Sequence, residues 1–109
     1  MELSFKLDVF EGPLDLLLHL ISKHQLNIYD IEISVLLEQY LSYIDSWQEA
    51  DMEVAGEFLA MAARLIYIKT VSLLPKYDEA DELKKELTGE LIEYAVCKMM
   101  AEKFRSRFV

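Results

Sequence analysis

The sequence has few of the residues that break a chain or cross-link it. Its 109 residues include three glycines, two prolines and one cysteine, Cys97. A single cysteine excludes an internal disulfide and is typical of a protein in a reducing compartment. With so little glycine and proline, long loops and disorder are not expected. We therefore expect one small domain made mostly of regular secondary structure.

Positive charge and long apolar runs are also scarce. Eleven Lys and Arg stand against twenty Asp and Glu, which gives a formal net charge of −9 and a pI near 4.6. Such an acidic surface does not favour independent binding to DNA or to an anionic membrane, because both attract basic proteins. No apolar run approaches the ~18 residues of a membrane span, and Glu2 and Lys6 interrupt the place of a signal peptide. We expect a soluble, acidic, cytoplasmic protein.

Apolar residues are abundant, at 53% of the chain, and their spacing predicts the first elements. In "LSFKLDVF" apolar and polar residues alternate, which is typical of a half-buried strand. Gly12 ends this strand, and Pro13 suits the first position of a helix that should end near His24. The fold class predicted is mainly α, with a short N-terminal strand followed by a three- to four-helix bundle.

Two further helices follow, and the end of the chain has two interpretations. Ser34 is a suitable N-cap for a helix from Val35 to about Gln48. Asp51 can cap a third helix, from Met52 to about Leu73, which Pro75 would stop. The charged run "DEADELKKE" is either a linker or the solvated start of a fourth helix that reaches about Arg107. Because this run offers little apolar surface, we expect such a helix to be loosely docked.

The third helix is apolar on nearly every side. Between Met52 and Ile68 the charged residues are Glu53, Glu57 and Arg64, which fall in one stripe about 40° wide. Such a helix is either the centre of a four-helix core or one that presents a face to a partner helix. The aromatic stripe of the second helix allows the same two interpretations, since Tyr and Trp serve both in cores and as interface anchors. It consists of Tyr40, Tyr43 and Trp47.

The residues show no arrangement for catalysis. His19 and His24 are five positions apart, so they do not share a helical face as a metal pair would, and Cys97 is distant. No glycine-rich phosphate loop is present. The surplus of carboxylates alone supports a small acidic hydrolase, which would also need a nucleophile or a metal beside a base. We expect no metal, no cofactor and no enzymatic activity.

Several motifs in order resemble one family. They are "FEGPLDLLLHLI", "IYDIEI", "EQYLSYI", "EFLAMAARLIYIK" and "LLP", between Leu3 and Pro75. Together they resemble the N-terminal domain of the segregation and condensation protein A family, the bacterial kleisins. Beyond Pro75 the likeness is looser, with "LIEYAVCKMMAE" where the family has a helix that begins with a similar Glu-Tyr. In "IKTVSLLP" the sequence departs from the family pattern at Val71 and Ser72.

The resemblance implies a subunit without catalysis of its own. A kleisin bridges the two heads of a dimeric SMC (structural maintenance of chromosomes) ATPase. It also carries a dimer of segregation and condensation protein B, in a ring that organises and separates chromosomes. The resemblance implies a cytoplasmic, nucleoid-associated protein that meets DNA only through this complex and needs no membrane. Since the sequence ends at Val109, the family's C-terminal head-binding domain is expected to lie outside it.

The family's N-terminal domain packs against the SMC neck, the coiled coil beside the ATPase head, and the resemblance carries this role to particular residues. The residues expected at the neck are Glu53, Val54, Glu57, Phe58, Met61 and Leu65, with Tyr43 and Trp47 from the second helix. By the same likeness, residues 1–75 form the neck-binding domain, 76–82 an acidic linker and 83–109 the start of the segment that binds protein B. The alternative is a helical domain that associates with itself through its exposed apolar faces.

Overall fold

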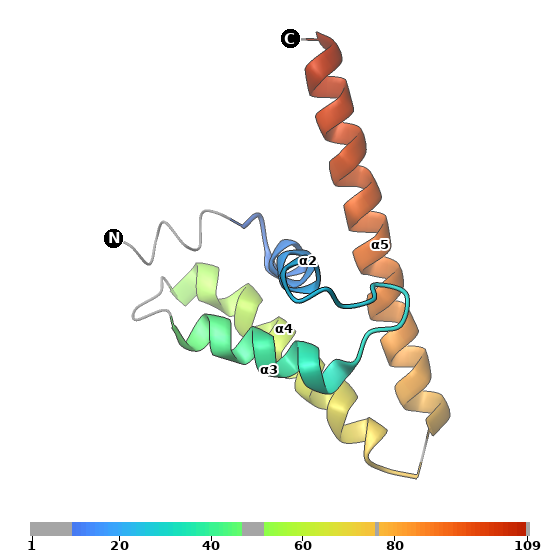
Figure 1. The fold of residues 1–109 in the computed structure, drawn as a ribbon. Helices are drawn as coiled ribbons and strands as arrows, with labels where there is room; N and C mark the ends of the chain where they lie inside the picture. The colour runs from blue at the N-terminus through green and yellow to red at the C-terminus, as the bar shows by residue number, and fades with distance from the viewer. Residues whose placement is uncertain (1–9, 47–51, 76, 109) are drawn as a thin grey trace.

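The structure is a computed structural model of the chain, and it describes residues 10–46, 52–75 and 77–108. Within them the chain forms four helices: α2 (Pro13–Lys23), α3 (Ile33–Asp45), α4 (Met52–Ser72) and α5 (Tyr77–Phe108) (Figure 1). These ranges contain no strand, so the predicted fold class is corrected from a strand followed by a bundle to a helical bundle. Its mainly α character is confirmed. Of the positions expected to form the strand, 3–10, residues 3–9 lie outside the described residues, and Phe10 is not in a strand.

Helix α2 begins and ends close to the predicted residues. Pro13 is its first residue, where a missing N–H costs nothing. At its end Gln25 adopts a left-handed conformation with φ of 55°, and the N–H of Leu26 donates to the carbonyl oxygen of Ile21 at 2.8 Å. This pairing satisfies a carbonyl that the helix end would otherwise leave without a donor. The fully buried leucines of α2, which form the centre of the core, are Leu16, Leu17 and Leu20.

Helix α3 starts earlier than predicted. Its first residue is Ile33, and Ser34, the expected N-cap, is an exposed residue inside the first turn. The physical reason is burial: Ile31 and Ile33 are both buried, and this fixes the chain before Ser34 can act as a cap. The structure records no side-chain cap at Glu32. The predicted end of this helix, near Gln48, lies outside the described residues.

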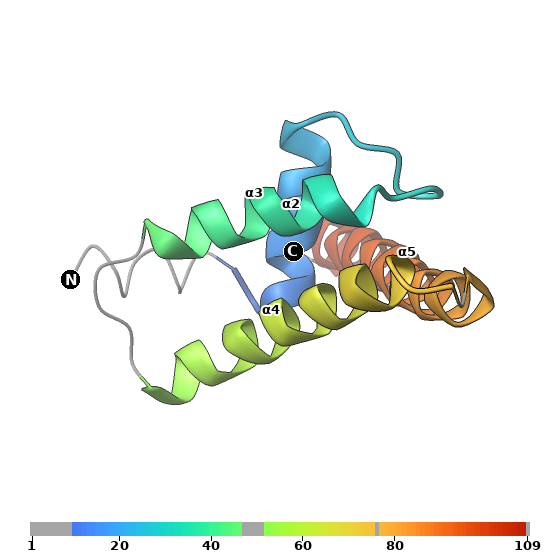
Figure 2. The ribbon, with the colours of Figure 1, turned by 90° about the horizontal axis from the view of Figure 1, so that it is seen from below.

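Helices α3 and α4 lie side by side, with α2 packed across both (Figure 2). A buried hydrogen bond joins the first two, since the hydroxyl of Tyr40 donates to the carbonyl oxygen of Phe58 at 2.8 Å. Tyr40 is fully buried, and this burial raises the pKa of its phenol. The bond therefore fixes how α4 is turned relative to α3.

Helix α5 begins at Tyr77, so the charged run is the start of a helix. Its N-terminal half packs against α4 and its middle against α2, while its C-terminal part extends beyond the other helices (Figure 1). Ala80, Leu87 and Leu91 are buried in contact with the bundle. The N-terminal half is thus anchored, which corrects the expectation of a loosely docked helix for that half.

A polar cluster ties α2 to the middle of α5. The ammonium of Lys98 donates to one carboxylate oxygen of Asp15, and the N–H of Glu11 donates to the other at 3.1 Å. The Tyr94 hydroxyl donates to a carboxylate oxygen of Glu11 at 2.7 Å. The hydrogen bond to Asp15 raises the pKa of Lys98. Because Asp15 is itself buried, water reaches the carboxylate of this ion pair poorly.

Replacement of Lys98 with methionine is expected to lower the free energy of unfolding by about 1–3 kcal/mol, because a buried carboxylate then loses a donor. Urea denaturation measures the change. Lys103→Met is the matched control, since Lys103 is an exposed lysine farther along the same helix. Equal stability of the two variants would mean that the ion pair with Asp15 contributes nothing to the docking of α5.

Candidate partner-binding surface

One face of α4 is apolar and exposed, and we call it the α4 outer face. Leu59, Ile66 and Tyr67 are 60%, 45% and 53% exposed. Their spacing of seven and eight positions places them on one side of the helix. The small or uncharged residues that complete this side, all exposed, are Gly56, Ala60, Ala63 and Thr70. A helix in water normally turns polar residues outward, so an outer face without charge indicates a surface for a partner.

The opposite face of α4 is buried, and it contains three of the predicted contact residues. Phe58, Met61 and Leu65 are 2%, 7% and 0% exposed and belong to the core. As folded, they are not accessible to another protein. They pack against the chain's own helices, and their contact with the neck stays a prediction.

Of the other predicted contact residues, the structure describes the side chains of Glu57 and Tyr43. Glu57 is exposed, and Tyr43 is half-buried with its ring 5.8 Å from the Phe10 ring and 6.1 Å from the His19 ring. Glu53 and Val54 lie in α4 but outside the residues whose side chains are described, and Trp47 lies outside the described residues.

Sequence reasoning missed Leu59, Ile66 and Tyr67. The signal was present as a second apolar series in the same helix, offset from the buried one. Since both series have helical spacing, the pattern alone does not distinguish the face that packs inward from the one that packs outward.

Arg64, in the charged stripe of α4, turns toward α5. The guanidinium of Arg64 binds both carboxylate oxygens of Glu90, with one N···O distance of 3.0 Å. This bidentate hydrogen bonding holds the pKa of the Glu90 carboxyl below its usual range and raises the pKa of Arg64. Next to it, the Tyr67 hydroxyl donates to a carboxylate oxygen of Glu79 at 3.3 Å. One edge of the α4 outer face is therefore lined by carboxylates of α5.

A second apolar surface lies on the C-terminal part of α5. Its exposed residues, spaced three, one and four positions apart, are Val96, Met99, Met100 and Phe104. Lys103 and Arg107 lie on the same side of the helix by the helical period. This stripe differs from the α4 outer face because basic residues accompany it.

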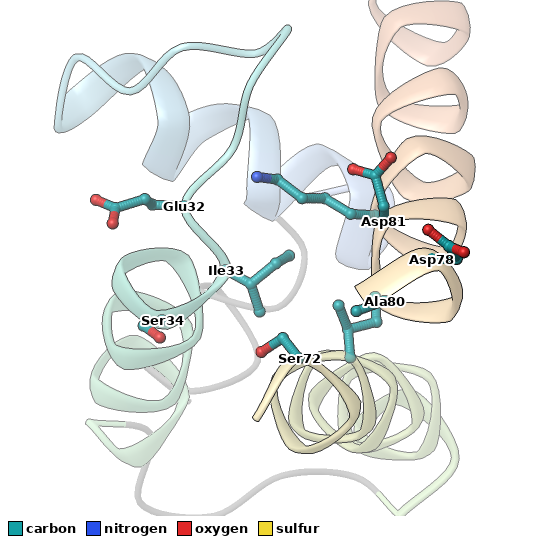
Figure 3. A pocket seen from close by; sticks show the side chains of 9 residues that line it. Glu32, Ile33, Ser34, Ser72, Asp78, Ala80 and Asp81 are labelled. Atoms are coloured by element: carbon teal, nitrogen blue, oxygen red, sulfur yellow. The ribbon is translucent and has the colours of Figure 1, made fainter. Parts of the chain in front are cut away.

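A pocket of about 410 Å³ opens where the start of α3 meets the end of α4 and the start of α5 (Figure 3). Ile33, Ile68 and Ala80 give it an apolar part. Its polar lining residues, from all three helices, are Glu32, Ser34, Ser72, Asp78, Asp81 and Lys84. The ammonium of Lys84 pairs with Asp30 at 3.2 Å. Neither histidine nor cysteine lines the pocket.

The described residues contain no group of three histidine, cysteine, aspartate or glutamate side chains placed to hold a metal ion. None of the helices in this part of the chain combines the length and the apolar character that a membrane crossing requires. The features that stand out are the two exposed apolar faces, on α4 and on α5, whose chemistry suits contact with other proteins.

Known proteins resemble this chain over nearly all of its length. The family model described as Segregation and condensation protein ScpA matches residues 20–108. A segregation and condensation protein A of Brevibacillus brevis is 49% identical over 117 residues, which cover 96% of this chain and 46% of that protein. A protein of the same name from Bacillus cereus strain AH187 is 43% identical over 116 residues, which cover 98% and 47%. The chain thus spans about half the length of these curated relatives. With a model match over most of its residues and such identity, the chain belongs to the segregation and condensation protein A family.

Proposed function

We propose that this chain is part of a non-catalytic kleisin subunit, which attaches to the neck of an SMC ATPase through the α4 outer face. The observation that carries the proposal is the charge-free, exposed row of Leu59, Ile66 and Tyr67 on a helix whose other side is core. A coiled-coil neck offers helices with apolar surface, and a helix packed on α4 would bury this row. Family membership supports a role in chromosome segregation and condensation.

The proposal changes the expected neck contacts. Glu57 is retained because it is exposed on α4, and Leu59, Ile66 and Tyr67 join it. Glu53, Val54 and Trp47 remain predictions, since the structure does not describe their side chains. Phe58, Met61 and Leu65 act indirectly, because they hold the α4 outer face in position from below.

A second partner, a dimer of segregation and condensation protein B, would use the apolar stripe of α5. The proposed division of the chain keeps residues 1–75 for the neck and, within 83–109, gives protein B the exposed stripe from Val96 onward. Residues 77–82 form the first turns of α5, so they would connect the two as a rigid helix. The chain would then link the ATPase to protein B at the nucleoid, in the cytoplasm, and would meet DNA only through that complex.

Two double variants test these assignments, and each is the control for the other. Leu59→Lys with Ile66→Lys is expected to weaken binding to an SMC head-plus-neck fragment by about 30-fold or more, as the loss of an interface anchor does. Val96→Lys with Met99→Lys is expected to leave that affinity unchanged and to weaken binding to protein B. Both pairs replace exposed residues, so circular dichroism should show unchanged helicity.

Three results would contradict the proposal. Neck binding that survives the α4 double variant would exclude the α4 outer face. A head fragment without the neck that binds as tightly as the longer fragment would move the contact away from the neck. A chain that binds no SMC fragment and dimerises across a concentration series, by light-scattering chromatography, would favour self-association.

A further inference from the structure

Helix α5 carries a row of glutamates beside the α4 outer face, and we call it the glutamate row. Its members are Glu79, Glu82, Glu86, Glu90 and Glu93. They follow one another at three or four positions, so they share one side of the helix over ~21 Å. Glu90 is half-buried and the others are exposed.

Contacts with α4 place this row at the edge of the α4 outer face. Glu79 accepts a hydrogen bond from the hydroxyl of Tyr67, which itself belongs to that face. Glu90 pairs with Arg64, one helical turn from Tyr67, and the charge of Glu86 also acts on Arg64. A helix lying on the α5 side of this face, over Ala60, Ala63 and Tyr67, would therefore have one flank against α5 carboxylates, because these residues lie closest to the α5 edge of α4.

The charge of the row is largely uncompensated within the chain. Among the described residues, Glu90 has a cationic partner in Arg64, but Glu82, Glu86 and Glu93 form no ion pair. Like charges three or four positions apart on a helix repel one another and weaken it. A cationic partner would remove this repulsion and would gain favourable pairing, so the arrangement favours basic side chains on whatever binds here.

We propose that the α4 outer face and the glutamate row form one composite surface, occupied by a partner's amphipathic helix that has an apolar seam flanked by lysine or arginine. This rests on the proposed function, in which the occupant is a helix of the SMC neck. The apolar seam packs on Ala60, Ala63 and Tyr67, with Leu59 and Ile66 at its outer edge. Basic residues spaced three or four positions apart face Glu82 and Glu86. The α4 outer face covers ~21 Å from Gly56 to Thr70, which matches about four turns of the bound helix.

Complementary charge of this kind acts mainly on the association rate and on the choice of partner. The α4 outer face supplies the buried apolar area, and the glutamate row supplies orientation, because the basic flank has to lie on the α5 side. A neck helix with its basic residues on one flank, turned end for end, would carry that flank away from the row. The composite surface therefore specifies both the partner and its direction.

Charge reversal at Glu82→Lys and Glu86→Lys tests the inference against the SMC head-plus-neck fragment. Both residues are exposed, and the variant leaves unchanged both members of the Arg64–Glu90 pair and of the Tyr67–Glu79 hydrogen bond. We expect affinity to fall about ten-fold at low salt, mostly through slower association, and the difference to shrink as salt screens the charges. The matched control is Glu38→Lys with Asp45→Lys, which changes the net charge equally on the exposed side of α3.

Each outcome decides a separate point. Weakening by the α5 reversal and not by the α3 reversal supports the composite surface. Equal effects of both, or no effect of either, would overturn it and leave the proposed function standing if Leu59→Lys with Ile66→Lys still abolishes binding. A wild-type chain that does not bind the fragment would overturn the proposed function, and this inference with it.

Discussion

Replacement of Phe58 with alanine is expected to lower the free energy of unfolding by about 3–5 kcal/mol. Its side chain is 2% exposed in the core, where α4 meets α3, so truncation leaves a cavity as well as losing buried apolar area. The carbonyl oxygen of the same residue accepts the Tyr40 hydroxyl at 2.8 Å, so disturbance at this position also affects a buried hydrogen bond. Chemical denaturation followed by circular dichroism measures the change.

The neighbouring residue provides the control. Leu59 is 60% exposed, so Leu59→Ala should change stability by no more than about 0.5 kcal/mol. Suppose instead that Leu59→Ala lowered the free energy of unfolding strongly and Phe58→Ala only slightly. Helix α4 would then have to be turned by about 100° from its position in the structure. Phe58 would then become available to a partner, as the sequence led us to expect.

The limits of the helices could be predicted largely from local signals. Pro13 and Pro75 mark a helix start and a helix end because proline suits the first position and cannot continue a helix. The predicted start of α3 was wrong, because Ser34 can act as a cap only where burial of the residues before it does not place it inside the helix. Ile33, which is 8% exposed, is held in the first turn by the core, and this tertiary effect has no local signature.

The orientation of α4 could not be predicted, and the reason lies in its charges. Glu57 and Arg64 form a stripe that a single helix would turn toward water. In the folded chain Arg64 instead turns toward α5 and pairs with Glu90. Apolar residues then lie on both sides of this stripe, and only the position of α5 decides that Leu65 is core and Ile66 is surface.

The composition of α5 does not predict that this helix packs against the others. Ala80, Leu87 and Leu91 are buried, but they are seven and four positions apart among charged residues and give a weak apolar pattern. A spacing of seven and four still keeps them on one side of a helix. Three buried side chains therefore anchor a helix whose sequence predicts a mostly solvated surface.

Replacement of Leu87 or Leu91 with alanine is expected to lower the free energy of unfolding by about 2–5 kcal/mol each. Both side chains are fully buried in the core. They anchor α5 before it leaves the other helices, so their loss should release the whole helix, and helicity should fall along with stability. Denaturation monitored by circular dichroism records both quantities in one experiment.

Val96→Ala and Met99→Ala are the matched controls, because these residues lie on the same helix with 46% and 53% exposure. They should leave stability nearly unchanged, whereas they remove part of the apolar stripe proposed for protein B. Mild effects at Leu87 and Leu91 would mean that α5 is a free arm in solution. The glutamate row would then have no fixed place beside α4, and a neck helix bound to the α4 outer face would gain nothing from a basic flank. The loss of stability when these two buried leucines are replaced therefore determines whether α4 and α5 can act as one surface.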